Sequence, residues 1–196
     1  RDLDWGIYPY TTSSSPTSGG AAVGSGLGPG RVHEVIGVTK VYSTSVGGGP
    51  FMTELFDDDG KKLQTIGREF GATTGRPRRC GWFDAVAVDF SAWVNGFTAL
   101  ALTKLDVLDT FETIKICTGY SVNGEVINHL PETAGQEVAI PIYEEVEGWM
   151  RDTTAARKWE DLPPKAQAFC KRLEELIHVP IKFISVGPER DQIIIM

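Results

Sequence analysis

The chain has 196 residues, 41% of them hydrophobic, which is enough for one sizeable core. Its formal net charge of -7 argues against a protein that coats nucleic acid or an anionic membrane, because such binding is driven by clustered lysine and arginine. No apolar run approaches the roughly 20 residues that span a bilayer. Three widely spaced cysteines, with neither CxxC pairs nor a Cys/His metal spacing, indicate a reduced, cytoplasmic, metal-free chain.

The first part of the chain is rich in serine, threonine and glycine. Residues 11–30 read TTSSSPTSGGAAVGSGLGPG, a composition that by itself favours a flexible linker. A dinucleotide-binding fingerprint is excluded because Pro29 stands where GxGxxG needs its third glycine. Residues 31–43, RVHEVIGVTKVYS, carry apolar side chains at helical spacing. We therefore expect a helix there, whose free N–H groups could hold an anion.

Two further segments predict a turn and a second helix. In residues 56–63, FDDDGKKL, the pair Asp59-Gly60 is typical of a hairpin turn. Further along, five aromatic or branched residues recur at helical spacing before Asn95-Gly96 ends the pattern. We expect all five to face the core: Trp82, Val86, Phe90, Trp93 and Phe97.

The second half predicts strands, a hairpin and one more helix. Residues 96–109 contain a short apolar run that breaks into polar residues, typical of a buried strand and the loop at its carboxyl end. Residues 111–130 predict two strands joined by a tight turn. Residues 161–179 predict a helix capped by Asp161. Its inward side chains would be Ala166, Phe169, Leu173 and Leu176. A strand, a Gly-Pro loop and a final apolar segment fill 181–196, so the fold class is α/β with a β-hairpin excursion.

Polar residues follow two of the predicted strands and could recognise guanine. Asp106 in the sequence TKLD can accept hydrogen bonds from guanine N1–H and the exocyclic amine, and the stem of Lys104 can lie against the base. Adenine lacks these donors and would leave the carboxylate unpaired. The second segment, Ser185 to Pro188, could offer backbone N–H groups to guanine O6. A lone TKxD is a weak signal, and the second strand end strengthens it.

A basic run, GATTGRPRRCGW, interrupts the acidic chain at residues 71–82. Three arginines within four positions allow three interpretations: a solvated loop, a nucleic-acid contact, or a pocket for a small anion. Nucleic acid is disfavoured because no aromatic residues interleave with the arginines for base stacking. The residues alone leave the solvated loop and the anion pocket open.

Six motifs along the chain resemble one enzyme family. YPYTTSSSPTSGG, GPFMTEL, EFGATTGRPRRCGW, LTKLDVLD, PIYEEVEGW and ISVGPER are together similar to the C-terminal half of adenylosuccinate synthetases, in the family's order. The resemblance runs through essentially the whole chain. It implies the C-terminal part of a P-loop-like, mostly parallel sheet flanked by helices. Residues 1–80 would carry the IMP and aspartate loops, and residues 98–196 the guanine-binding part.

The resemblance also implies roles for individual residues. Thr12 would contact the IMP phosphate and Arg76 would reach the IMP side. The aspartate would be held by Thr73, Thr74 and Arg78, with the arginine gripping a carboxylate bidentately. The guanine pocket would be formed by Lys104, Asp106, Ser185 and Gly187. Arg79 has no ligand role in this scheme, and we expect it to serve packing or the surface.

In the family that the chain resembles, GTP phosphorylates the 6-oxygen of IMP, and L-aspartate then displaces the phosphate to give adenylosuccinate, GDP and phosphate in purine (AMP) biosynthesis. The resemblance implies Mg²⁺, a cytoplasmic homodimer, and neither nucleic-acid nor membrane partners. The family's phosphate loop, with its magnesium contact, and its catalytic histidine are absent from these residues. We therefore expect no catalytic or metal-binding residue here and no activity from this piece alone. The alternative is a free-standing module that binds a guanine nucleotide or an acidic metabolite without turnover.

Overall fold

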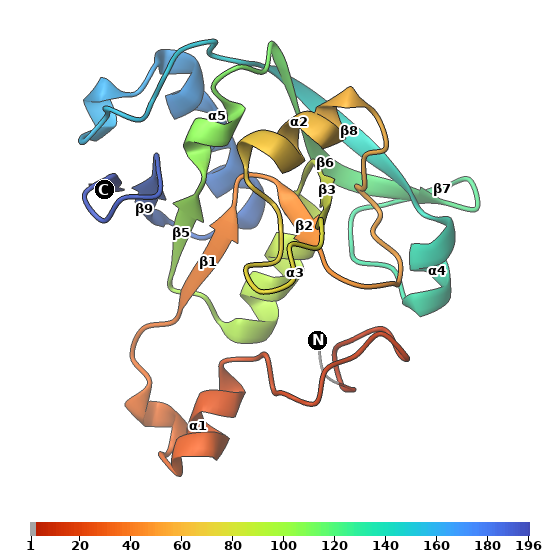
Figure 1. Cartoon of the computed structure of the whole chain (residues 1–196). Helices are drawn as coiled ribbons and strands as arrows, with labels where there is room; N and C mark the ends of the chain where they lie inside the picture. Colours follow the sequence, from red (N-terminus) through yellow and green to blue (C-terminus); the bar gives the residue numbers. More distant parts are fainter. Residues whose placement is uncertain (1–2) are drawn as a thin grey trace.

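The computed structural model describes residues 3–196 (Figure 1). In chain order its elements are α1 (Gly19–Ser25), η1 (Pro29–Arg31), β1 (Ile36–Lys40), β2 (Ser43–Ser45), α2 (Asp58–Ile66), β3 (Arg79–Gly81), β4 (Phe83–Asp84), α3 (Ala85–Asn95), β5 (Ala99–Thr103), η2 (Leu105–Leu108), β6 (Thr113–Val122), β7 (Glu125–Ile127), α4 (Thr133–Val138), β8 (Ile140–Glu147), η3 (Trp159–Asp161), α5 (Pro164–Ile177), β9 (Ile181–Ser185) and β10 (Ile193–Ile195). The predicted α/β class is confirmed.

One sheet has the strand order β1-β5-β9-β10, and its first three strands run parallel. Helix α5 lies behind this sheet in Figure 1. Its buried face shares one hydrophobic core with the strands, and that core includes Phe169, Leu173, Leu100 and Ile184. Burial on this scale is the main favourable contribution to folding. The parallel arrangement places the carboxyl ends of β5 and β9 next to each other.

A second sheet is built around β6, which pairs with β4 in parallel and with β7 and β8 in antiparallel register. The predicted hairpin of residues 111–130 is confirmed. Its turn uses Asn123 and Gly124, both at positive φ, as a tight turn between twisted strands requires. Strand β8 was not predicted from the sequence. A short ribbon, β2 with β3, leads from the first sheet into the second.

The predicted helix at 31–43 is wrong, because this segment contains β1. Ile36–Lys40 pairs in parallel with Ala99–Thr103 of β5. The apolar residues that matched helical spacing are β-branched and favour a strand once a partner strand is present. The anion site that we expected at the start of such a helix is lost with it.

The predicted hairpin turn at Asp59-Gly60 is also wrong, because these residues lie in the first turn of α2. Asp57 is the N-cap, and its carboxylate accepts a hydrogen bond of 3.1 Å from the Gly60 N–H. Asp58 and Asp59 add negative charge at the positive end of the helix. A run of acidic residues before a lysine-rich stretch is therefore a helix start here.

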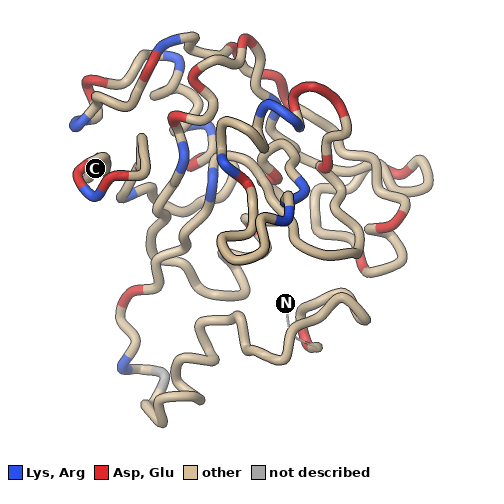
Figure 2. Tube along the Cα trace, in the orientation of Figure 1, with Lys and Arg blue, Asp and Glu red and all other residues tan. Residues whose placement is uncertain are grey.

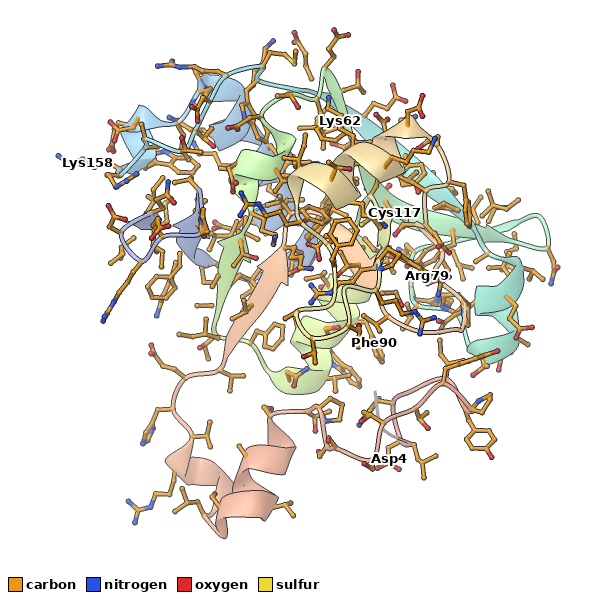
Figure 3. The ribbon with its side chains drawn as sticks, viewed as in Figure 1. Asp4, Lys62, Arg79, Phe90, Cys117 and Lys158 are labelled. Atoms are coloured by element: carbon orange, nitrogen blue, oxygen red, sulfur yellow. The ribbon has the colours of Figure 1, made fainter. Side chains whose placement is uncertain are left out.

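The other two predicted helices form, with corrections. Helix α3 ends at Asn95 with Gly96 in a left-handed conformation, as predicted. Trp93, however, is 73% exposed, so the expectation that it faces the core was wrong. Trp93 lies in an aromatic group with Phe90, labelled in Figure 3, and Trp5. The expected cap at Asp161 is wrong: Pro163 occupies the N-cap position of α5 without a side-chain capping hydrogen bond, and the Asp161 carboxylate accepts from the Arg157 and Lys158 N–H groups instead.

The N-terminal segment lies below the sheets in Figure 1 and includes α1, in which no residue is buried. It is anchored to α3, because Asn95 Oδ1 accepts from the Ser18 N–H and the Asn95 carbonyl accepts from Ser18 Oγ, both at 2.8 Å. The expected flexible linker at 11–30 thus contains a helix and a fixed contact. Across residues 3–196 no helix has the length and hydropathy to span a bilayer.

Candidate functional site

A cavity of about 440 Å³ opens where β5 and β9 end. Its walls come from three segments that are distant in the sequence: the end of α2, the β5–η2 turn, and the loop after β9. All four residues expected to recognise guanine lie in its lining. The lining residues are Ile66, Gly67, Arg68, Thr103, Lys104, Asp106, Val107, Ser185, Gly187 and Pro188.

Lys104 makes the turn that opens the cavity. Its backbone is left-handed, with φ of 65°, and this reverses the chain between β5 and the buried Leu105 of η2. The ammonium group donates to the Gly67 carbonyl at 2.6 Å. The side chain is therefore held across the end of α2, with its stem available as one wall of the cavity.

Asp106 is the unsatisfied polar group of the cavity. Its Oδ1 is buried and accepts no hydrogen bond from residues 3–196. Burial raises the pKa of the Asp106 carboxyl, and the residue's own backbone N–H and the nearby Lys104 ammonium oppose this rise. A buried acceptor without a donor is costly to maintain, so it favours a ligand that brings N–H groups.

The loop after β9 supplies the opposite wall. Ser185 Oγ donates to the Gly187 carbonyl at 2.9 Å and fixes the turn. The Val186 N–H donates to the Gln192 carbonyl at 3.0 Å, which leaves the Gly187 N–H as our candidate donor to a ligand. A Cβ at Gly187 would lie 2.1 Å from Gln192 Oε1, so a side chain there would displace the end of the Gln192 side chain.

The threonines and arginines of the basic run belong to a closed loop. Its stem is formed by Glu69 and Arg78, since the Arg78 N–H donates to the Glu69 carbonyl at 2.8 Å. Within the loop, the Gly71 N–H donates to the Arg76 carbonyl at 2.8 Å. Thr73, Thr74 and Arg76 are exposed at its tip. Three of the residues expected to hold substrate are therefore open to solvent.

The three arginines do not form one clamp. Arg79, labelled in Figure 3, pairs through Nε and Nη2 with the Glu54 carboxylate. Its Nη1 donates to the carbonyls of Gly47 and Gly49 at 3.2 and 2.9 Å. Arg79 thus holds the 47–49 loop, in agreement with the packing role expected for it. Arg78 instead directs Nη1 to Glu69 Oε2 at 2.9 Å.

Glu69 is the residue that the sequence analysis missed. Its side chain is fully buried and accepts from Lys40 Nζ at 2.8 and 2.9 Å, from the Tyr42 hydroxyl at 2.5 Å and from Arg78 at 2.9 Å. Lys104 Nζ lies 3.6 Å from Glu69 Oε1. Burial alone would raise the pKa of Glu69, but these hydrogen bonds lower it to about 2. Its only sequence signal is an acid flanked by Arg68 and Phe70.

Thr12, expected to contact an IMP phosphate, does not line the cavity at β5 and β9. It is exposed, and its Oγ1 accepts from the Ser14 N–H at 3.3 Å. Nearby Tyr10 lines a different cavity of about 350 Å³ together with Thr44 and Phe51. Among residues 3–196 there is no group of three His, Cys, Asp or Glu side chains placed to hold a metal ion.

Comparison with known proteins places these features in a family. The sequence profile described as "Adenylosuccinate synthetase" matches residues 1–194. The adenylosuccinate synthetase of Geobacter sulfurreducens is 57% identical over 196 residues, which are 100% of this chain and 45% of that protein. The one from Mycobacterium marinum is 53% identical over 195 residues, 99% of this chain and 45% of that protein.

A solved structure agrees. The fully ligated adenylosuccinate synthetase from Plasmodium falciparum superposes with a TM-score of 0.95 at 39% identity, covering 100% of this chain and 47% of that one. The chain therefore spans about half the length of the relatives that it matches. On the profile, the sequence identities and the shared fold, the chain belongs to the adenylosuccinate synthetase family.

Proposed function

We propose that this chain forms the guanine-recognising and substrate-recognising part of a GTP-dependent ligase. In the proposed reaction GTP phosphorylates the 6-oxygen of IMP, and the amine of L-aspartate displaces that phosphate to give adenylosuccinate, GDP and phosphate. Membership of the adenylosuccinate synthetase family supports this reaction. The observation that carries the role of this chain is the unpartnered, buried Asp106 Oδ1 in the cavity at the strand ends.

Guanine fits the polar groups of that cavity. Its N1–H and exocyclic amine would donate to the Asp106 carboxylate, and its O6 would accept from the Gly187 N–H. The Lys104 stem would pack on the base while its ammonium stays on the Gly67 carbonyl. Pairing the desolvated carboxylate with two donors contributes about 1.5–3 kcal/mol, and a base without these donors forfeits that contribution.

The exposed loop would recognise the small acidic substrate. Thr73 and Thr74 at its tip, with Arg78 at its stem, are proposed to hold the aspartate carboxylates. Arg76 and Thr12 are proposed to face IMP. Arg78 already shares Glu69 with Lys104, so the stem of this loop is tied to the guanine cavity. The division into residues 1–80 for IMP and aspartate and 98–196 for guanine remains part of the proposal.

Further properties of the whole enzyme are proposed from the family alone. They are a requirement for Mg²⁺, a homodimer and a cytoplasmic location. Residues 3–196 offer no cluster of acidic or histidine side chains that fits a magnesium ion. The proposed contribution of this chain is to bind and orient the base and the substrates.

The proposal is tested by comparing the rates with GTP and with xanthosine triphosphate in a variant of Asp106. In the full-length enzyme, Asp106→Asn should lower kcat/KM for GTP roughly 100-fold, and it should relatively favour xanthosine triphosphate, whose C2 carbonyl would meet an amide donor. Asp152→Asn is the matched control, because Asp152 is an exposed carboxylate close enough to influence Asp106. An unchanged preference for GTP in Asp106→Asn would remove Asp106 from the site. Binding of GTP without any turnover would favour a binding module.

A further inference from the structure

Glu69 stands at the junction between the two proposed binding regions. On one side, its backbone carbonyl and its carboxylate both accept from Arg78, which closes the substrate loop. On the other side, residues 66–68 directly before it line the guanine cavity. A single short segment therefore forms the wall of one region and the stem of the other.

The same carboxylate gathers cations from three separate elements. Lys40 ends β1, Arg78 leads into β3, and Lys104 follows β5. Figure 2 shows basic positions gathered in the middle of the molecule, near the ends of β1 and β5. The side chains of Lys40, Arg78 and Lys104 are 23–36% exposed, whereas the side chain of Glu69 is fully buried. The three basic side chains are thus partly accessible to solvent and share one buried counter-ion, Glu69.

The surrounding packing leaves Glu69 little freedom. Tyr42 is buried and donates its hydroxyl to Glu69 Oε1. Gly67 lies directly against that hydroxyl, since a Cβ at Gly67 would come within 2.3 Å of Tyr42 Oη. The Gly67 carbonyl in turn accepts from Lys104. Any displacement of the Glu69 carboxylate would therefore change the positions of both the Lys104 and the Arg78 side chains.

We propose that Glu69 is a positioning residue that sets Arg78 and Lys104 relative to each other, so that the guanine cavity and the substrate loop take up their binding geometry together. It acts through these two side chains without touching either substrate. Without its charge, Arg78 and Lys104 would lose their shared counter-ion and repel each other. This inference rests on the function proposed above.

The test measures both substrates in the full-length enzyme carrying Glu69→Gln, which keeps the shape of the side chain and removes its charge. We expect the KM values for GTP and for aspartate each to rise about tenfold, while kcat at saturation stays within about threefold. Glu54→Gln is the matched control, because Glu54 pairs with Arg79 and does not line the guanine cavity. Both KM values should stay within about twofold of wild type in this control.

Two results would overturn the inference: a rise in only one of the two KM values, or unchanged KM values with a lowered melting temperature. If Glu69→Gln does not fold, Tyr42→Phe decides, because it removes one neutral hydrogen bond and keeps the charge. A parallel rise of about twofold supports the inference, and unchanged constants refute it. Absence of turnover by the wild-type enzyme with GTP, IMP and aspartate would instead refute the proposed function itself.

Discussion

The proposed guanine cavity at the ends of β5 and β9 and the proposed substrate loop, residues 69–78, meet at Glu69, yet they are built differently. The cavity lies at the ends of strands whose Leu100, Leu102 and Ile184 are fully buried, so its walls are fixed by the sheet and the core. The loop is closed by backbone hydrogen bonds at its stem and exposes its tip at residues 72–77. A ligand in the cavity would meet groups that the core holds in place, whereas a ligand at the tip would meet exposed side chains that lack such packing.

The comparison also shows where charge is used. Among the described residues, one carboxylate oxygen in the cavity, Asp106 Oδ1, has no hydrogen-bond donor, and in the proposed function this selects for a donor-rich base. The loop pairs its stem arginine, Arg78, with the buried Glu69 and leaves Arg76 exposed, where the proposed anionic substrate could reach it. In the proposed function, specificity for the neutral base therefore depends on desolvation, and affinity for the acidic substrate depends on accessible cations.

The largest effect should come from removing the charge that connects the two regions. Glu69 has a folded pKa of about 2 against an ordinary 4.5, which corresponds to about 3 kcal/mol of stability. Because the folded pKa is depressed, this stability is present above pH 4.5 and is lost as the pH falls toward 2. Urea unfolding should show Glu69→Gln about 3 kcal/mol less stable at pH 7, with the gap closing below pH 4.5.

The control for this measurement is Glu125→Gln, on an exposed residue of β7, which should change stability by less than about 0.5 kcal/mol at every pH. A stability gap for Glu69→Gln that persists unchanged at pH 3 would assign the effect to packing rather than to charge.

A smaller difference in stability and in KM should distinguish a glycine in the cavity wall, Gly67, from one at the loop tip, Gly75. At Gly67 a methyl group would meet Tyr42 Oη at 2.3 Å and the Leu63 carbonyl at 2.6 Å, so we expect Gly67→Ala to destabilise by about 2 kcal/mol and to raise the KM for GTP. Gly75 has open space around it but a φ of 65°, and Gly75→Ala should cost about 1 kcal/mol with no change for GTP. If Gly67→Ala and Gly75→Ala had equal unfolding free energies and equal KM values for GTP, the proposed difference between the cavity wall and the loop would be contradicted.

The smallest effect should distinguish the two neighbouring arginines. Arg78→Leu should raise the KM for aspartate about tenfold and that for GTP less, because the lost charge-assisted contact lies at the stem of the loop. Arg79→Leu should leave both constants within about twofold and lower the melting temperature, since Arg79 holds Glu54 and two loop carbonyls. A rise in the KM for GTP alone would reassign Arg78 to the nucleotide.

Elements with strong local signals could be predicted from the residues alone. The Asn123-Gly124 hairpin, the stop at Gly96 and the buried strand before Lys104 depend on turn chemistry and short-range hydrophobic pattern. The sequence also indicated that two strand ends, at Asp106 and at Ser185 to Pro188, could present complementary groups to one base, and both line the same cavity. Local patterns were sufficient to predict elements whose conformation depends mainly on residues close together in the sequence.

Other features depend on contacts between segments that are distant in the sequence. Residues 36–40 became a strand because β5 lies beside them, and a partner strand is not visible in local periodicity. Trp93 faces outward although its spacing matched the buried side of α3. The contacts of Glu69 depend on the fold, because three separate segments place basic side chains next to its carboxylate. These side chains are Lys40, Arg78 and Lys104. Contacts between residues far apart in the chain exist only once the core has formed, so the residue types alone could not reveal them.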